Sequence, residues 1–119
     1  MFRGSTPLPP PLASATLAAG RILQADPRRR ERLNRNADYV KAALRKARIE
    51  FPQTSGPIIA FPARNEREIA RLKRRLLAAG IYPPFVKYPG GPEQGGFRFV
   101  ISSEHRREHL DWLIGVLAR

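Results

Sequence analysis

Twelve of the 119 residues are prolines, and they restrict where this chain can form helices and strands. Proline lacks a backbone N–H, so it is tolerated at a helix start or a sheet edge but disrupts the interior of either element. A first helix can therefore start near Pro9–Pro11, and the pair Asp26-Pro27 predicts the start of a second. The pair Pro83-Pro84 confines a strand over Ile81–Lys87 to a sheet edge or a bulge.

Helical spacing of apolar residues extends this prediction to four helices. Asn65 and Glu68 resemble a capping box before the third helix, Gly80 is placed to end it, and Ser103 can cap a last helix that runs to about Ala118. Leu12, Thr16, Ala19 and Leu23 share one face of the first helix, which suits close packing against a larger partner. The residues expected to face inward are Leu33, Ala37, Val40, Leu44 and Ala47, then Ile69, Leu72, Leu76 and Ala79, and finally Leu110, Ile114 and Leu117.

Three short segments are predicted as strands: Pro57–Phe61, Ile81–Lys87 and Gly96–Ser102. The order is two helices followed by β-α-β-β-α, an α/β fold in the form of a small α+β domain. The crossover rule and the short second connection favour the strand order 1-3-2, mainly antiparallel, with both later helices on one face. We divide the chain into a helical segment, residues 1–48, and a small α/β domain, residues 49–119.

Composition narrows the function classes. The chain has no cysteine, which excludes disulfides and thiolate catalysis and is typical of a cytoplasmic protein. No apolar run is long enough to span a membrane. The net charge of +12, concentrated in Arg28–Arg35 and Arg67–Arg75, permits binding to a nucleic acid or another polyanion. Solvated helix faces explain the same charge.

The stretch GGFRFVISSEH, Gly95–His105, has three interpretations. Phe97 and Phe99 after a glycine resemble an RNA-stacking strand, but alternation along a strand equally explains them as core. His105, Glu108 and His109 have the spacing of a zinc site, yet the chain contains no other histidine to complete it. We therefore predict no metal.

Arg98 is the third possibility. It alternates with the two phenylalanines, so it should lie on the opposite face of the strand from them. A guanidinium there offers a planar fork for a carboxylate or phosphate, or it simply extends into solvent.

Three segments in matching order then indicate a family. FRGSTPLPP (Phe2–Pro10), GIYPP (Gly80–Pro84) and FRFVISSEH (Phe97–His105) resemble the C-terminal part of the α-oxoamine synthases. These are pyridoxal-phosphate enzymes of the class I/II aminotransferase fold, and they include 8-amino-7-oxononanoate synthase and 2-amino-3-ketobutyrate CoA ligase.

The resemblance implies roles for particular residues. Arg98 matches the arginine that binds the substrate carboxylate, and Ser5 and Thr6 match a pair whose threonine contacts the cofactor phosphate across a dimer. His105 matches a structural histidine. The segment Tyr88–Pro92 departs from the better-known synthases, which leaves the acyl substrate open.

The family's Schiff-base lysine has no counterpart here, because Lys41, Lys46, Lys73 and Lys87 lack its sequence surroundings. We therefore expect a domain fragment that is inactive alone and carries no pyridoxal phosphate by itself. The full-length enzyme would be a homodimer acting on amino-acid or acyl-CoA substrates. The alternative is a free-standing basic module that binds RNA or another polyanion.

Overall fold

The computed structural model describes residues 8–62, 65–88 and 93–118. The chain divides into two compact units, residues 1–31 and residues 32–119. Within the described ranges we find no helix with the length and hydrophobicity that crossing a lipid bilayer requires.

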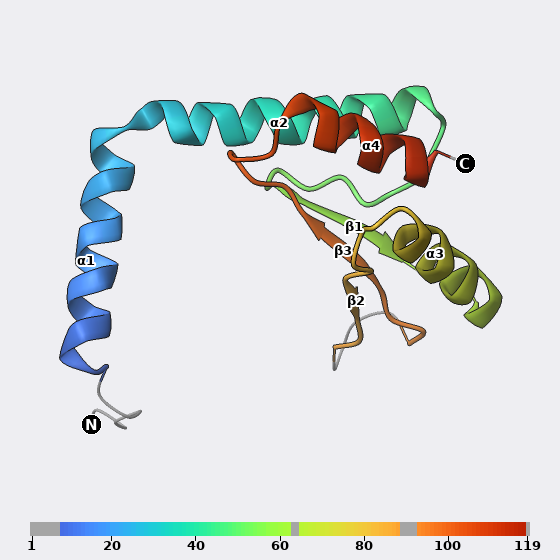
Figure 1. Cartoon of the computed structure of the whole chain (residues 1–119), viewed down its shortest axis with the longest axis horizontal. Helices are drawn as coiled ribbons and strands as arrows, with labels where there is room; N and C mark the ends of the chain where they lie inside the picture. Colours follow the sequence, from blue (N-terminus) through green and yellow to red (C-terminus); the bar gives the residue numbers. More distant parts are fainter. Residues whose placement is uncertain (1–7, 63–64, 89–92, 119) are drawn as a thin grey trace. The chain divides into compact units, whose positions relative to one another are not determined.

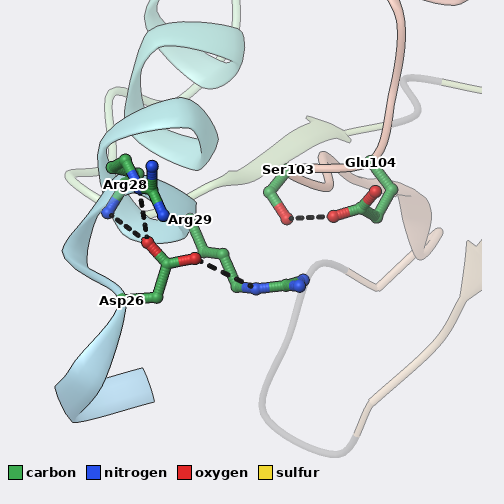
Figure 2. Close-up of polar contacts among 5 residues, drawn as sticks. All are labelled: Asp26, Arg28, Arg29, Ser103 and Glu104. Carbon is green, nitrogen blue, oxygen red and sulfur yellow. Dashed lines mark hydrogen bonds and ion pairs between the residues drawn. The ribbon is translucent and has the colours of Figure 1, made fainter. Parts of the chain in front are cut away.

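The first unit contains helix α1 (Pro10–Ala25) and the first turn of α2 (Pro27–Lys46). Asp26 lies between the two helices. Its carboxylate accepts hydrogen bonds from the backbone N–H of Arg28 at 3.2 Å and from the Arg28 side chain at 3.0 Å, and it lies 3.7 Å from Arg29 (Figure 2). The hydrogen bond from the Arg28 side chain lowers the pKa of Asp26 below its ordinary value. The predicted N-cap at Asp26 is thus confirmed, whereas none of the α1 side chains is buried.

The second unit begins within α2 and contains all of the buried core (Figure 1). Ala37, Val40 and Leu44 are buried, as the spacing predicts, and Leu33 is half-buried. Ala47 was also expected to face inward, and this was wrong: α2 ends at Lys46, and Ala47 is exposed just before Arg48, whose φ is 57°.

The sheet has the predicted strand order, β1-β3-β2, with antiparallel pairs (Figure 1). Strand β1 (Ile58–Pro62) pairs along the whole of β3 (Gly96–Val100). Strand β2 is shorter than expected: it spans only Phe85–Val86 at the edge of the sheet. Pro83 and Pro84 have no N–H to donate, so a regular ladder starts only after them, although the Pro84 carbonyl accepts from the Arg98 N–H at 2.8 Å.

Helix α3 (Glu66–Ala78) starts and ends as predicted. The Asn65 side chain accepts a hydrogen bond from the Glu68 N–H at 2.9 Å, and Gly80 follows the helix with a φ of 71°. A positive φ at this position is the left-handed conformation that glycine adopts without strain.

Helix α4 (Arg107–Leu117) starts later than expected, with Arg106 as its N-cap, so the prediction that Ser103 caps it was wrong. The Asn36 side chain donates to the carbonyls of Ser102 and His105, which holds these residues in a turn before the helix. The Ser103 hydroxyl donates instead to the Glu104 carboxylate at 3.3 Å (Figure 2).

One buried cluster joins α2, the sheet, α3 and α4. The cluster includes Leu44 from α2, Leu76 from α3 and Leu110 from α4, packed with the inward side chains of the strands. The inward side chains of the strands are Ile59, Phe97 and Phe99, and Ile101, directly after β3, is buried with them. The opposite face of the sheet is therefore the one on which a site can form.

Candidate functional site

Arg98 lies on the open face of β3, as its alternation with the phenylalanines predicts. Phe97 and Phe99 are only 2% and 5% exposed, whereas Arg98 between them is half-buried. Its cross-strand partner on β1 is Ala60, and Gly96 precedes it on the same face. Same-face neighbours in adjacent strands stand only about 5 Å apart, so large side chains here would crowd the guanidinium. Ala60 and Gly96 are small and leave space around it.

The Arg98 guanidinium forms a hydrogen bond with the side chain of Tyr88. Nη1 of Arg98 donates to the Tyr88 hydroxyl oxygen at 3.1 Å. No carboxylate among the described residues lies within ion-pair distance of Arg98, so no negative side chain of that part of the chain competes with a ligand for the guanidinium. A cation with a neutral partner remains able to bind an anion.

A pocket of about 500 Å³ surrounds this pair on the open face of the sheet. Its walls come from the segment after α2, from β1, and from the residues around β2 and β3. They include Thr54, Gly56, Ile58, Ala60, Val86 and Gly96. The walls are mostly apolar, which strengthens the interaction between a charged ligand and the guanidinium by excluding water.

Gly95 sets the position of β3 next to this pocket. Its φ is 77°, and a Cβ built at this residue would stand 2.7 Å from the Val86 carbonyl oxygen and 2.9 Å from the Phe85 ring. Both the conformation and the close approach require glycine.

Lys41 fixes another wall of the same pocket. It is only 4% exposed, and its Nζ donates to the carbonyl oxygens of Thr54 and Gly56, at 2.6 Å each. Thr54 and Gly56 both line the pocket around Arg98. The lysine thus anchors the segment that closes one side of the candidate site, and charge patterning did not predict a buried lysine on α2.

A second pocket, of about 750 Å³, lies along the other end of β3. Arg98 and Val100 line it together with His109 and Trp112 of α4 and Ile81. The Trp112 indole N–H donates to the Ala79 carbonyl at 2.9 Å, which connects α4 to the end of α3. Arg98 is therefore shared by both pockets.

The two histidines have structural contacts. Nδ1 of His105 accepts from the Ser102 N–H at 3.1 Å, and Nδ1 of His109 accepts from the Arg106 N–H at 3.3 Å. Among residues 8–62, 65–88 and 93–118, no three or more histidine, cysteine or acidic side chains are grouped so as to hold a metal ion. The role predicted for His105, a structural residue before the last helix, agrees with its contact.

Burial decides between the two interpretations of the aromatic pair. The rings of Phe97 and Phe99 are stacked 6.4 Å apart within the core, and Phe97 also meets Phe85 edge-on at 5.2 Å. Buried rings have no face left for a nucleotide base to stack on. The prediction that they belong to the core is confirmed.

Ser5 and Thr6, predicted to bind the cofactor, lie outside the described residues, as does most of the turn Tyr88–Pro92. Tyr88 itself is described, and sequence reasoning assigned it no role. Its contact with Arg98 depends on where β2 ends and cannot be read from local spacing.

Comparisons with known proteins give one consistent result, although no family model matches the chain. A Bacillus cereus (strain ZK / E33L) protein, provisionally named as an 8-amino-7-oxononanoate synthase, is 32% identical over 114 residues, which are 95% of this chain and 29% of that protein. The 8-amino-7-oxononanoate synthase of Symbiobacterium thermophilum is 29% identical over 119 residues. This chain therefore spans about 30% of the length of the curated relatives it matches.

The fold is found in solved structures of related enzymes. An 8-amino-7-oxononanoate synthase from Francisella tularensis matches 95% of this chain and 33% of its own chain, with a TM-score of 0.77 and 23% identity. A serine palmitoyltransferase from S. paucimobilis, solved with a PLP–myriocin aldimine, matches 76% of this chain with a TM-score of 0.67 and 24% identity.

Proposed function

We propose that this chain, a homologue of the C-terminal small domain of the α-oxoamine synthase family, binds the substrate carboxylate in a pyridoxal-phosphate-dependent transferase resembling 8-amino-7-oxononanoate synthase. The observation that carries the proposal is the Arg98 guanidinium, a cation with a neutral partner in a mostly apolar pocket. A carboxylate matches its planar fork with two parallel hydrogen bonds.

The rigidity of β3 supports this role. Arg98 is held between two buried phenylalanines, and its own backbone N–H is fixed by the Pro84 carbonyl at 2.8 Å. A binding residue on a strand with buried neighbours keeps its position better than one on a free loop. The strand thus holds the backbone of Arg98 at a fixed place. Only the side-chain torsions of Arg98 need to adjust when a ligand binds.

The described residues do not fit the covalent attachment of pyridoxal phosphate. That attachment needs a lysine amine in the site, and no lysine lines either of the pockets that contain Arg98. The Lys41 amine is occupied by two carbonyls, and the Lys73 amine lies 4.4 Å from the centre of the Phe85 ring. We therefore assign the cofactor to the rest of the enzyme and expect this chain to be inactive alone.

Three further parts of the proposal rest on the resemblance. Residues 1–48 connect the small domain to a large cofactor-binding domain, Thr6 with Ser5 reaches the cofactor phosphate, and the complete enzyme is a homodimer. The exposed apolar side chains of α1, among them Leu12 and Leu23, support a packing partner outside the described residues. The resemblance also implies that the complete enzyme acts on amino-acid or acyl-CoA substrates.

Carboxylate binding is tested on the purified chain by titrating propionate into 15N-labelled protein and following the backbone and arginine side-chain signals by NMR. We expect saturable shifts centred on Arg98 and Ala60, with an affinity on the order of millimolar or weaker, as for a single charge-assisted pair. Arg98→Lys keeps the charge but loses the fork, so binding should weaken clearly. Arg74→Lys on α3 is the matched control, because Arg74 is exposed and lines neither pocket. Equal binding by Arg98→Lys and the unchanged chain would refute the proposal.

Cofactor absorbance provides a second test. Pyridoxal phosphate mixed with the chain should give no stable absorbance band of an imine beyond that of free lysine at the same concentration. A stable band that disappears with one lysine substitution would contradict the assignment of the cofactor to the rest of the enzyme.

The alternative, a polyanion-binding module, retains support only from the net charge of +12. It predicts binding to single-stranded RNA that weakens steeply with salt. Since Phe97 and Phe99 are buried, such binding would arise from exposed arginines and not from ring stacking.

A further inference from the structure

We propose that Tyr88 is a positioning residue for Arg98: its hydroxyl oxygen holds Nη1, so that Nε and Nη2 face the carboxylate bound there. This inference rests on the proposed function, since it specifies how the same pocket holds its ligand. It starts from the hydrogen bond between Nη1 of Arg98 and the Tyr88 hydroxyl oxygen, at 3.1 Å.

The register of the sheet explains how the two side chains meet. Val86 pairs with Gly96 at the end of β2, and Tyr88, two residues further on, lines the same pocket and contacts Arg98. Gly96 has no side chain, so the space between Arg98 and Tyr88 on this face stays open. Arg98, Tyr88 and Gly96 all line the pocket of about 500 Å³.

The chemistry of the phenol suits an anion site. Its oxygen accepts one N–H from Arg98 without bringing the negative charge of a carboxylate next to the guanidinium. An aspartate or glutamate at this position would also hold the guanidinium, but it would neutralise the charge and repel a carboxylate. Tyrosine fixes the cation without competing for it.

The guanidinium still has donors for the ligand after this contact. Arginine carries five N–H groups, of which one goes to Tyr88, and no other residue in the described ranges accepts from Nε or Nη2. A carboxylate can accept both fork hydrogens at once, one on each of its oxygens. The ligand class is therefore a carboxylate with a small or apolar substituent, in keeping with the mostly apolar walls.

The exposure of Tyr88 makes the proposal testable without loss of the fold. Tyr88 is 55% exposed, so Tyr88→Phe removes only the hydroxyl and leaves the ring in place. Tyr82 is the matched control, because it is 85% exposed and lines neither pocket that contains Arg98.

The experiment measures propionate affinity by NMR for the unchanged chain, Tyr88→Phe, Tyr82→Phe and Arg98→Lys. Tyr88→Phe should bind roughly tenfold more weakly, the effect of one hydrogen bond to a charged group at a partly exposed site. Tyr82→Phe should bind as the unchanged chain does. In the absence of ligand, the Arg98 Nη1 hydrogens should exchange and rotate faster in Tyr88→Phe, which a role in the fold alone would not cause.

The outcomes separate the two proposals. Normal binding by Tyr88→Phe, together with weakened binding by Arg98→Lys, would overturn the role of Tyr88 and leave carboxylate binding by Arg98 intact. Normal binding by Arg98→Lys would overturn the proposed function itself. Unchanged rotation of the Arg98 guanidinium in Tyr88→Phe would refute the positioning role even if affinity fell.

Discussion

Phe97 and Phe99 on one face of β3 are buried in the core, whereas Arg98 and Val100 on the other face are half-buried and 60% exposed. Neighbouring residues of one short strand therefore meet opposite environments. The covered face holds the fold together through apolar contacts, and the open face carries the arginine that we propose binds a carboxylate. The difference suggests that stability and binding can be altered separately in this strand.

The covered face should give the largest stability change. Phe99→Ala removes a ring that is 5% exposed and packs edge-on to Phe61 at 5.8 Å. We expect the free energy of unfolding to fall by about 3–5 kcal/mol, from lost apolar burial and the cavity left behind. Urea unfolding followed by circular dichroism measures it. Val100→Ala on the open face should change it by less than about 0.5 kcal/mol, and equal losses at both positions would remove the contrast between the faces.

A substitution at Lys41 tests whether its buried ammonium group supports the pocket wall on the open face of the sheet. Lys41→Met keeps the length of the side chain but leaves the carbonyls of Thr54 and Gly56 without their donor. An acceptor left without a partner costs up to about 1–3 kcal/mol when buried, and less here because Thr54 is exposed and Gly56 half-buried; removing a buried charge offsets part of this cost. We expect a net loss of about 2 kcal/mol and weaker propionate binding. Lys46→Met, at an exposed position, is the control; a stable Lys41→Met chain with normal binding would contradict the anchoring role.

A substitution at Gly95 tests whether the close contact between β2 and the start of β3 contributes to stability. Gly95→Ala adds a Cβ that would stand 2.7 Å from the Val86 carbonyl oxygen, at a φ of 77°. The left-handed conformation alone costs about 1–2 kcal/mol for a residue with a Cβ, so the unfolding midpoint should decrease. Gly115→Ala in α4 has no atom within 4 Å of the added Cβ and should be stabilising, by up to about 1 kcal/mol. A neutral Gly95→Ala would mean that β2 can move away without loss.

The smallest expected effect is a pH dependence of the free energy of unfolding, which arises from a contact between α2 and α4. The Tyr39 hydroxyl of α2 donates to the Asp111 carboxylate of α4, and this hydrogen bond raises the pKa of Tyr39 above its ordinary value of 10.0. A raised pKa means that the contribution to stability is present below pH 10.0 and is lost as the pH rises through the folded-state pKa. Urea midpoints at increasing pH should therefore decline more for the unchanged chain than for Tyr39→Phe. Parallel decline of both chains would contradict the prediction.

The sequence predicted most of the fold because local patterns set it. Alternation placed Phe97 and Phe99 in the core and Arg98 opposite them, and Asp26, Asn65 and Gly80 marked helix ends that the structure confirms. These features depend on residues close together in the chain. Such features can therefore be predicted from the sequence without knowledge of contacts between distant segments.

Contacts between distant segments were harder to predict. Lys41 has the appearance of a surface residue on a charged helix, and its burial depends on carbonyls supplied by the segment after that helix. The N-cap of α4 was misplaced because Asn36, in α2, holds the turn before it. Tyr88 contacts Arg98 from beyond the end of β2, past Gly96, and no spacing rule anticipates this contact.

The pocket around Arg98 has walls from separate parts of the chain, namely Thr54 and Gly56, Ala60 on β1, and Tyr88 after β2. These groups come together only in the folded chain. A carboxylate that occupies the pocket therefore binds the native state alone, and mass action links its concentration to the melting temperature. At one hundred times the dissociation constant the folded state gains about 2.7 kcal/mol, so a simple thermal melt in rising propionate reports occupancy of the site.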